Sequence, residues 1–359
     1  MEIKNPKILF VRLGAIGDVI RTLPALRALR HNLSDAYIAW VVEDRAASLL
    51  INHPDLNKVF VLPRKEWQKN PLSVKTLKEI IQLTKKLRKE NFDLVLDFHG
   101  LFKSGLITFL TGVKCRVGYT RKFSKEGNFL FINEQVTLPD YKINRAERNL
   151  LLVKHLGLKI DEHNPLIPIS EKDREVVAST IFSELTSFSG PKIIIHPGSS
   201  LSTPYKRWGV RRFAQVADSI IQKYGGKIFF TAGNDERERV NKITKQMAES
   251  HYVLCQPETL TQLAEALRRC DLFIGNDTAP MHLAAFVGTP VIALFGPTDP
   301  IENAPFGQEA IVIRKDVSCN PCRIRECQNL LCMDAITVND VLEAVDRVLL
   351  RKGFNPNPS

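Results

Sequence analysis

Three short turns in this chain carry residue types that could do chemistry. The first, residues 12–18, reads RLGAIGD and ends in Asp18. The second, residues 196–206, reads HPGSSLSTPYK and contains Ser199, Ser200 and Lys206. The third, residues 275–282, reads GNDTAPMH. A carboxylate can accept a proton, whereas hydroxyls, a lysine and backbone N–H groups can hold a phosphate. The sequence therefore offers a base in its first half and an anion site in its second.

Asp18 follows a Gly-x-x-Gly turn, and its position admits two roles. At the start of a helix a carboxylate complements the helix dipole by about 0.3–1 kcal/mol. At the mouth of a cleft it could serve as a general base. Glu43 and Asp44 end the next expected strand, where a dehydrogenase would hold the ribose of NAD, so that class stays open. Asp18 argues against it, because a carboxylate there would repel a bound pyrophosphate.

The third turn combines a helix cap with a set of donors. Asp277 or Thr278 is expected to cap a helix whose first turn carries Pro280. The same opening presents backbone N–H groups at the carboxyl end of a strand. His282 lies one turn into this helix, where a lone histidine is usually structural. Capping alone and phosphate binding both remain open.

Short apolar strands alternate with amphipathic helices, which favours parallel sheets with helices on both faces. We expect strands at residues 7–12, 37–42, 59–62, 94–98, 192–196, 227–231, 272–275 and 291–295. A helix should run from the first turn to His31 with a break near Pro24, and others should cover 73–90, 210–224, 236–248, 259–269, 279–287 and 338–352. The fold class is α/β, with two Rossmann-like, doubly wound domains facing across a cleft at their strand ends.

The domain boundary is expected near the polar stretch 161–170, which contains Pro165 and Pro168. We place an N-terminal domain at 1–165, a C-terminal domain at 166–352 and a disordered tail at 353–359. No apolar run reaches the roughly 18–20 residues of a membrane span, and residues 1–6 lack the apolar core of a signal peptide. We therefore expect a cytoplasmic protein.

The net charge of +11 is unevenly distributed. Residues 1–160 hold 28 Lys and Arg against 15 Asp and Glu, whereas the remainder holds 22 against 24. The first half is expected to meet nucleic acid, an anionic membrane surface or an acidic small molecule, and a Lys-rich solvated surface is the alternative. The basic helix at 73–90 adds to the membrane option. The apolar face of this helix consists of Leu77, Ile80, Ile81, Leu83, Thr84 and Leu87. An ordinary surface helix of the domain is the alternative to a membrane role.

Four of the seven cysteines cluster near the C-terminus in the pattern C-x2-C-x4-C-x4-C. They are Cys319, Cys322, Cys327 and Cys332. The spacing could hold a structural Zn²⁺, although it is not that of a common zinc ribbon. Reduced thiols that pack a loop and a redox disulfide are the alternatives. No catalytic metal and no cofactor are expected.

Four stretches of the chain together resemble the heptosyltransferase family of lipopolysaccharide core assembly, which are B-type glycosyltransferases. They are residues 8–26 (ILFVRLGAIGDVIRTLPAL), 93–104 (DLVLDFHGLFKS), 196–213 (HPGSSLSTPYKRWGVRRF) and 275–300 (GNDTAPMHLAAFVGTPVIALFGPTDP). With their spacing they cover nearly the whole chain. The resemblance implies the GT-B fold and transfer of heptose from ADP-heptose to the Kdo region of lipopolysaccharide.

The resemblance also implies roles for individual residues. Asp18 matches the aspartate proposed to deprotonate the acceptor hydroxyl in an inverting, single-displacement transfer. Lys206 matches the lysine that neutralises the leaving diphosphate without an obligatory metal. The residues matching the nucleotide-sugar site are Ser199, Ser200, Glu236, Asp277, Thr278, Ala279 and His282. The expected acceptor-binding residues are Gly17, Lys103, Arg121 and Lys122.

The partners implied are an ADP-sugar, an acidic acceptor of the Kdo–lipid A type and transient contact with the inner face of the inner membrane. Lys103, Arg116, Arg121, Lys122 and Lys125 form a basic loop that is closer to first heptosyltransferases. The Cys-rich stretch is closer to second ones, so the step stays open. The sequence also permits a same-fold transferase with another sugar or acceptor, a nucleotide-sugar epimerase, or a basic nucleic-acid or membrane-surface module. Nucleic acid is disfavoured because no aromatic residues alternate with the basic clusters.

Overall fold

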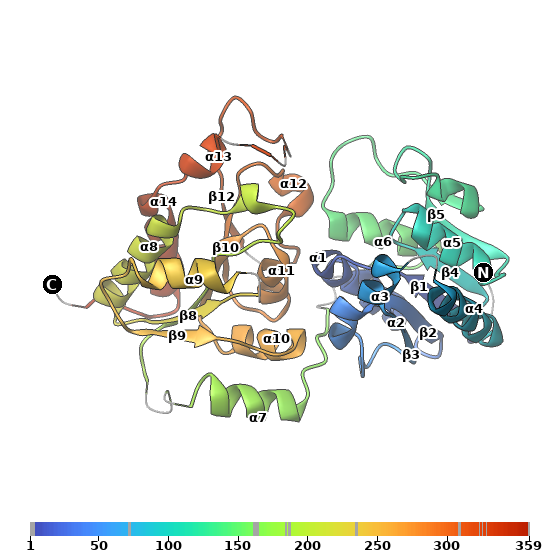
Figure 1. The fold of residues 1–359 in the computed structure, drawn as a ribbon, viewed down its shortest axis with the longest axis horizontal. Helices are drawn as coiled ribbons and strands as arrows, with labels where there is room; N and C mark the ends of the chain where they lie inside the picture. The colour runs from blue at the N-terminus through green and yellow to red at the C-terminus, as the bar shows by residue number, and fades with distance from the viewer. Residues whose placement is uncertain are drawn as a thin grey trace. The chain divides into compact units, whose positions relative to one another are not determined.

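The computed structural model describes residues 4–70, 73–160, 165–183, 185, 188–233, 236–307, 310–322, 324, 326–327 and 329–357. Contacts between residues divide the chain into two compact units, Met1–Pro168 and Ile169–Ser359. This division falls just beyond the boundary expected at residue 165. Each unit holds one six-stranded sheet with helices on its faces (Figure 1).

The sheet of the first unit is parallel throughout, in the order β3-β2-β1-β4-β5-β6. Its strands are β1 Lys7–Val11, β2 Tyr37–Glu43, β3 Lys58–Leu62, β4 Leu94–Asp97, β5 Cys115–Tyr119 and β6 Glu134–Val136. The central strands are apolar on both sides and almost fully buried, as a sheet covered by helices on both faces requires. The chain winds outward from β1 to β3, returns, and winds outward from β4 to β6. The direction of winding therefore reverses between β1 and β4.

Helices of the first unit pack on both faces of this sheet. They are α1 Ile16–Ile20, α2 Leu23–Asn32, η1 Asp44–Leu49, α3 Arg64–Lys69, α4 Val74–Lys89, α5 Phe102–Leu110, η2 Asn128–Phe131 and α6 Arg145–His155. The expected break near Pro24 is confirmed, since α1 ends at Ile20 and α2 starts at Leu23. Helix α2 packs against α6, and right-handed crossovers place α4 and α5 on the opposite face.

The second unit repeats the same winding with the order β12-β11-β10-β7-β8-β9, again all parallel. Its strands are β7 Lys192–His196, β8 Lys227–Thr231, β9 Tyr252–Cys255, β10 Leu272–Asn276, β11 Val291–Leu294 and β12 Ala310–Ile313. Its helices are α7 Glu171–Thr180, η3 Pro204–Lys206, α8 Val210–Tyr224, α9 Arg237–Thr244, α10 Leu260–Arg268, α11 Ala279–Phe286, α12 Pro300–Asn303, α13 Leu331–Asp334 and α14 Val338–Arg351. Here the winding reverses between β7 and β10. The expected α/β class with two doubly wound sheets is confirmed.

The C-terminal tail differs from the disorder expected at 353–359. Among the described residues 353–357, Phe354 packs against the core of the second unit. The backbone N–H of Asn357 donates to the Lys223 carbonyl over 2.6 Å. The apolar ring of Phe354 is the physical reason, because burying it removes apolar surface from water.

Helix α4 is amphipathic, as expected, and its apolar face is only partly buried. Its N-cap is Ser73, whose hydroxyl accepts from the Thr76 N–H at 3.1 Å. Leu87 is buried, whereas Leu77 and Ile81 on the same apolar face are 47% and 54% exposed. Across the residues the structure describes, no helix has the length and apolarity needed to cross a membrane.

Candidate active site

Asp18 lies in α1, directly after β1, and three arginines surround its carboxylate. Nη2 of Arg12 is 2.7 Å from Oδ2, and Oδ1 lies 2.5 Å from Nη2 of Arg21 and 3.7 Å from Nη1 of Arg145. Sequence reasoning missed these partners. Arg21 follows Asp18 by one helical turn, a spacing that predicts an ion pair. Arg145 is distant in the sequence and leaves no local signal. Gly17, expected at the acceptor site, precedes Asp18 in the same turn of α1.

The arginines keep Asp18 ionised. Burial alone would raise the pKa of Asp18, but the charges of Arg12, Arg21 and Arg145 outweigh it and hold the pKa far below its ordinary value. A carboxylate in this state is a weak base. Three guanidinium groups gather around this carboxylate, and such a cluster suits an anionic ligand that competes with Asp18 for the arginines.

Asp97 ends β4, the strand paired with β1, and fixes the turn that follows. Its buried carboxylate accepts from the backbone N–H groups of His99 and Gly100 at 2.9 and 3.1 Å. The Ser104 hydroxyl and the Asn128 amide donate to its other oxygen at 2.9 and 2.7 Å. Burial raises the pKa of Asp97, and these hydrogen bonds oppose the rise. Asp97 is therefore a positioning residue.

His99 presents polar atoms that the protein does not satisfy. Both ring nitrogens are shielded from solvent, and neither has a hydrogen-bond partner among the described residues. Burial lowers the pKa of His99 to about 3, with a further contribution from Arg12 and Lys103. A neutral imidazole beside Asp18 can donate to one ligand atom and accept from another. Sequence reasoning did not single out His99, although the end of the strand beside β1 is where ligands of such sheets bind.

Glu43 ends β2, and its buried carboxylate is shared by two cations. Nζ of Lys103 lies 2.8 Å from Oε1, and Nη1 of Arg64 lies 2.9 Å from Oε2. Gly14 permits this arrangement, because a Cβ at that position would stand 2.9 Å from the same carboxylate. Glu43 is not available to bind a ribose, so the dehydrogenase alternative loses its support. Lys103, expected to bind the acceptor, is paired with Glu43 while staying partly exposed.

The two other expected acceptor cations follow β5. Arg121 stacks over the Phe129 ring, 5.5 Å from its centroid. Lys122 forms a surface ion pair with Asp140. Both are exposed, and no contact among the described residues joins them to Asp18. The structure therefore groups Gly17 with Asp18 but not Arg121 or Lys122.

In the second unit, Asn276 joins the turns that follow β7 and β10. Its amide nitrogen donates to the Pro197 and Gly198 carbonyls at 2.9 and 3.0 Å, and its amide oxygen accepts from the Trp208 N–H at 3.1 Å. The side chain is fully buried. Asn276 fixes the two turns relative to each other, a role that no local pattern distinguishes from the roles of its neighbours.

The two serines expected to bind the nucleotide sugar differ in role. Ser199 is buried, and its hydroxyl donates to the Thr203 carbonyl at 2.7 Å and accepts from Arg207 Nε at 3.0 Å. These bonds shape the loop and occupy the hydroxyl. Ser200 is exposed, with its Oγ 3.1 Å from the Ser202 hydroxyl. Of the two, Ser200 is the one that offers its hydroxyl at the surface.

Lys206 and Asp277 form an ion pair at this strand edge. Nζ of Lys206 lies 2.6 Å from Oδ2 of Asp277, and the Thr298 hydroxyl donates to the same oxygen at 2.8 Å. The pair is mostly shielded from solvent, with 17% and 5% of the two side chains exposed. Asp277 thus holds an ammonium group between the turns after β7 and β10.

Helix α11 starts at Ala279 and brings its N-terminus to the same edge. Thr278 is the N-cap, but its side chain makes no capping hydrogen bond and instead donates to the Asn276 carbonyl at 3.3 Å. The N–H groups of Ala279 and Met281 have no acceptor within the helix, and Pro280 has no N–H group. An anion here would be favoured by those donors and the helix dipole. His282 is buried one turn further on.

Glu236 packs its carboxylate into the turn after β7. It accepts from the Gly233 N–H at 2.8 Å and lies 3.6 Å from Nε2 of His196. Gly198 makes room for it, since a Cβ at that position would clash with the Glu236 carboxyl group. Glu236 therefore joins the other second-unit residues at one strand edge, although it is nearly buried.

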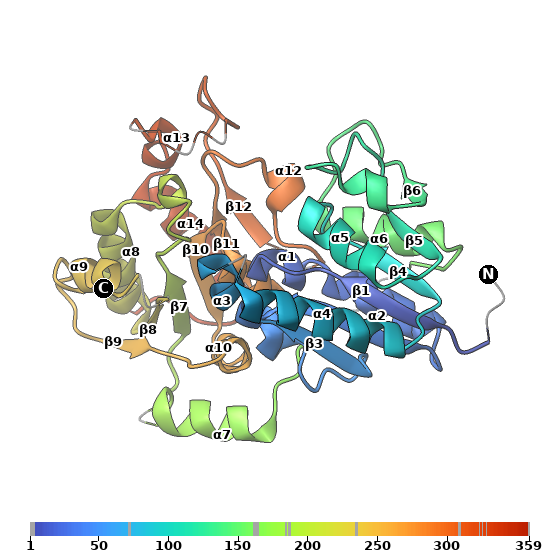
Figure 2. The same ribbon diagram turned by 45° about the vertical axis from the view of Figure 1, so that its right-hand side comes forward.

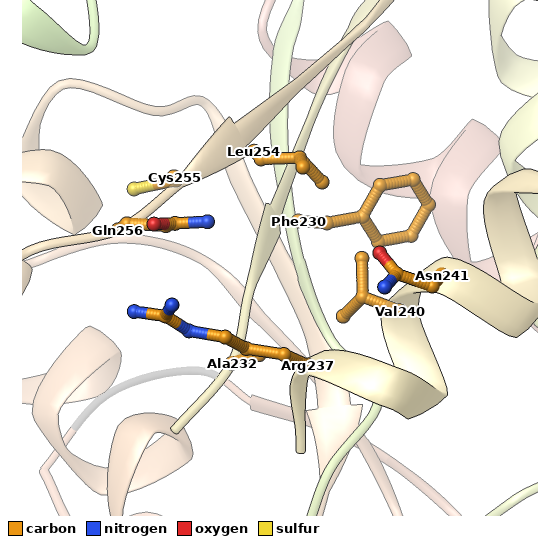
Figure 3. A pocket seen from close by; sticks show the side chains of 8 residues that line it. All are labelled: Phe230, Ala232, Arg237, Val240, Asn241, Leu254, Cys255 and Gln256. Atoms are coloured by element: carbon orange, nitrogen blue, oxygen red, sulfur yellow. The ribbon is translucent and has the colours of Figure 1, made fainter. Parts of the chain in front are cut away.

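A small pocket lies beyond β8 and β9, under α9 (Figure 3). Its lining consists of Phe230, Ala232, Arg237, Val240, Asn241, Leu254, Cys255 and Gln256. Figure 3 shows the polar ends of Arg237 and Gln256 on one side and the Phe230 ring on the other. Its volume of about 20 Å³ holds roughly one water molecule, so in this state the pocket cannot hold the nucleobase of a donor.

The four clustered cysteines all line a second cavity of about 240 Å³, together with Tyr205 and Pro297. Every one is a free thiol. Burial raises the pKa of Cys332, and neighbouring Cys319 and Cys322 add to the rise. No three His, Cys, Asp or Glu side chains in the described part of the chain are arranged to hold a metal ion. The cavity adjoins the site, because Tyr205 precedes Lys206 and Pro297 precedes Thr298.

Comparison with known proteins finds similar glycosyltransferases. The lipooligosaccharide heptosyltransferase 2 of Campylobacter jejuni is 28% identical over 346 residues, covering 93% of this chain and 95% of that protein. A glycosyltransferase family 9 structure from Veillonella parvula has a TM-score of 0.84 and 25% identity, covering 98% and 99% of the two chains. The Escherichia coli heptosyltransferase WaaC with ADP has a TM-score of 0.76 and 22% identity, covering 95% and 99%, and it was also solved with ADP-2-deoxy-2-fluoro heptose.

The two-sheet architecture is thus that of the heptosyltransferase structures. The family described as glycosyltransferase family 9 (heptosyltransferase) matches residues 80–332, which is most of the chain and includes three of the four stretches noted in the sequence. The chain belongs to glycosyltransferase family 9, the heptosyltransferases, and is a glycosyltransferase.

Proposed function

We propose that the protein is an inverting heptosyltransferase that transfers heptose from ADP-heptose to the Kdo region of the lipopolysaccharide inner core, without a catalytic metal. The observation that carries this proposal is the Lys206–Asp277 ion pair beside the N-terminus of α11 at the strand edge of the second unit. The family relationship and the ADP-bound relative support an ADP-sugar as donor.

The donor diphosphate would bind where Lys206, Ser200 and the N–H groups of Ala279 and Met281 gather. As the bond from the sugar to the diphosphate breaks, negative charge grows on the departing phosphate. Lys206 and these donors would stabilise that charge, which removes the need for a metal ion. Asp277, held also by Thr298, would keep the ammonium group in place.

On the acceptor side, Asp18 would accept the proton as the acceptor oxygen bonds to the sugar carbon and ADP departs. Carboxylates of a Kdo acceptor would pair with Arg12, Arg21 and Arg145. Each arginine drawn away raises the pKa of Asp18 and strengthens it as a base. His99, next to this cluster, would hydrogen-bond the acceptor sugar. Binding of the correct acceptor would thereby activate the base. A lipid-bearing acceptor also implies transient contact with a membrane.

A donor screen tests the proposal. The protein is incubated with ADP-heptose, ADP-glucose or UDP-sugars and a Kdo–lipid A acceptor, with and without EDTA, and products are weighed by mass spectrometry. We expect one heptose added per acceptor from ADP-heptose alone, with EDTA having no effect. Transfer of another sugar, or isomerised donor without acceptor, would replace this function, and loss of activity in EDTA would refute the metal-free mechanism.

A further inference from the structure

Helices α4 and α5 lie side by side on one face of the first unit, as Figures 1 and 2 both show. Nε of Arg88 in α4 donates to the Leu110 carbonyl at the end of α5 over 2.8 Å. Leu83, Leu87 and Ile107 from the two helices pack into the same core cluster. The outer surfaces of the helices therefore form one continuous face of the unit.

This face exposes apolar side chains that the core does not use. On α4 they are Val74, Leu77 and Ile81, and on α5 they are Phe102, Leu106 and Phe109. Each set falls three or four residues apart, so it forms a stripe along the outer side of its helix. Leu130, in the η2 turn packed against α5, extends the surface and is 74% exposed. We refer to these seven residues as the α4–α5 face.

Lysines border the stripe on α4. Lys78 precedes Ile81 by three residues and Lys85 follows it by four, which places both beside Ile81 on the helix surface. Lys78, Lys85, Lys86 and Lys89 have no carboxylate partner within the described residues.

The acids of this helix do not offset these lysines, because each is already engaged. Glu79 accepts from the Trp67 indole at 2.7 Å and lies 3.9 Å from Nζ of Lys75, one turn before it. Glu90, just beyond the helix, is bound by Tyr37 and Lys58. The lysine charges therefore remain uncompensated at the surface.

We propose that the α4–α5 face docks on the surface of an anionic phospholipid bilayer. The proposal rests on the proposed function in one respect, that the acceptor carries lipid. Exposed aliphatic and aromatic side chains enter the boundary between headgroups and acyl chains. The flanking lysines reach the phosphates with their charged ends while their stems lie on the apolar surface.

Charge selects a bilayer over other partners. A second copy of this chain would present the same lysines and repel. A nucleic acid would pair with the lysines but has no use for an aliphatic stripe, since its backbone contacts are electrostatic. An anionic bilayer satisfies both features at once.

Sedimentation with vesicles tests the proposal on the full chain. Vesicles of phosphatidylglycerol and phosphatidylcholine are compared with vesicles of pure phosphatidylcholine. Both are tested at about 0.15 M NaCl and at about 0.5 M NaCl, where exposed charges are screened more strongly. The test variants are L77S/I81S and K78E/K85E. The matched control is L350S/K245E, which changes an exposed leucine and an exposed lysine of the second unit. Thermal unfolding of each variant checks the fold.

We expect the wild type and the control to bind the anionic vesicles and to release them at high salt. K78E/K85E should bind at least tenfold more weakly, since each lysine contributes roughly fivefold. L77S/I81S should bind at least tenfold more weakly because it removes two apolar side chains that enter the bilayer. Equal binding by all proteins, or no binding by the wild type, would overturn the proposal. So would loss of RNA binding or of self-association in the variants while vesicle binding is unchanged.

Transfer to a delipidated Kdo acceptor separates this proposal from the proposed function. All variants should transfer heptose to it at the wild-type rate, because the α4–α5 face lies outside the residues assigned to catalysis. If the wild type transfers nothing to this acceptor, the proposed function fails while the vesicle result stands. If the wild type transfers heptose normally but does not bind vesicles, only the docking proposal is refuted.

Discussion

At the scale of single residues, Asp18 is the proposed base, and its arginine neighbours hold its pKa low. We predict that D18N lowers turnover by about 10²–10⁴, as loss of a general base commonly does, while ADP affinity stays nearly unchanged. Steady-state kinetics and calorimetry with ADP measure the two effects. Because D18N also leaves three arginines without their shared partner, the unfolding transition must be compared with that of the wild type. Equal loss of turnover and ADP affinity would remove Asp18 from the role of base.

Lys206 belongs to the same scale, since one ammonium group is assigned to the departing phosphate. K206A should lower turnover by about 10²–10³, the usual effect of losing one charge-stabilising donor. K206R keeps the charge and should recover part of the rate, which separates charge from geometry. Unchanged turnover in K206A would mean that another cation serves the diphosphate.

The lowered pKa of His99 predicts how the unfolding free energy depends on pH. Its folded pKa of about 3 lies below the ordinary 6.5, so the unfolded chain binds the proton first as pH falls. The stability that His99 contributes is fully present above pH 6.5 and is lost as pH falls toward 3. Between pH 6.5 and about pH 4 the unfolding free energy of the wild type should therefore fall more steeply than that of H99Q. Chemical denaturation at a series of pH values measures this dependence. The same slope of unfolding free energy against pH in the two proteins would contradict the prediction.

Sequence reasoning identified residues at this scale where the signal was local. The Gly-x-x-Gly turn pointed to Asp18, and the short third turn pointed to Asp277. The partners that decide what those residues can do were harder to predict, because Arg145 and Asp18 are brought together only by the fold. The occupied hydroxyl of Ser199 could not have been foreseen either, since it depends on Arg207 from the next turn.

At the scale of elements, Asn276 links two turns that no covalent bond joins. N276A would leave the Trp208 N–H and two carbonyls buried without their partner, so we expect a loss of about 1–3 kcal/mol in unfolding free energy or more. ADP affinity should fall as well, because we propose that these turns form the donor site. Chemical denaturation and calorimetry measure the two losses.

The matched control is N149A in the first unit. Asn149 is also buried and bonds Tyr119, Arg21 and Thr22. N149A should cost comparable stability while leaving ADP affinity intact. If both variants weaken ADP binding equally, the effect of N276A is general destabilisation.

The sequence predicts long, apolar elements well and short strands near the sheet edges poorly. The expected limits of β7, α8 and β8 are those found in the structure. Strand β5 was missed because CRVGY contains an arginine and a glycine, and β6 because EQV has one buried residue. Both depend on hydrogen bonds from neighbouring strands, which a local pattern does not reveal.

At the scale of the whole molecule, the uneven charge predicts how salt affects the two substrates. Residues 1–160 hold 28 basic against 15 acidic side chains, so acidic acceptors should bind the first unit more weakly as ionic strength rises. The largely buried Lys206–Asp277 pair is screened less. We therefore predict that the KM for the acceptor rises severalfold between about 0.05 and 0.5 M NaCl while the KM for the donor changes little. Equal slopes would show that the charge asymmetry does not guide binding.

Each unit is one contiguous segment of the chain, and its sheet contains no strand from the other unit. The chain passes from one unit to the other only once, after Pro168. A ribosome consequently releases every strand of the first sheet before it makes any strand of the second. The first unit can fold during translation, without waiting for the C-terminus, and domains synthesised in this manner avoid much of the misassembly that entangled chains suffer.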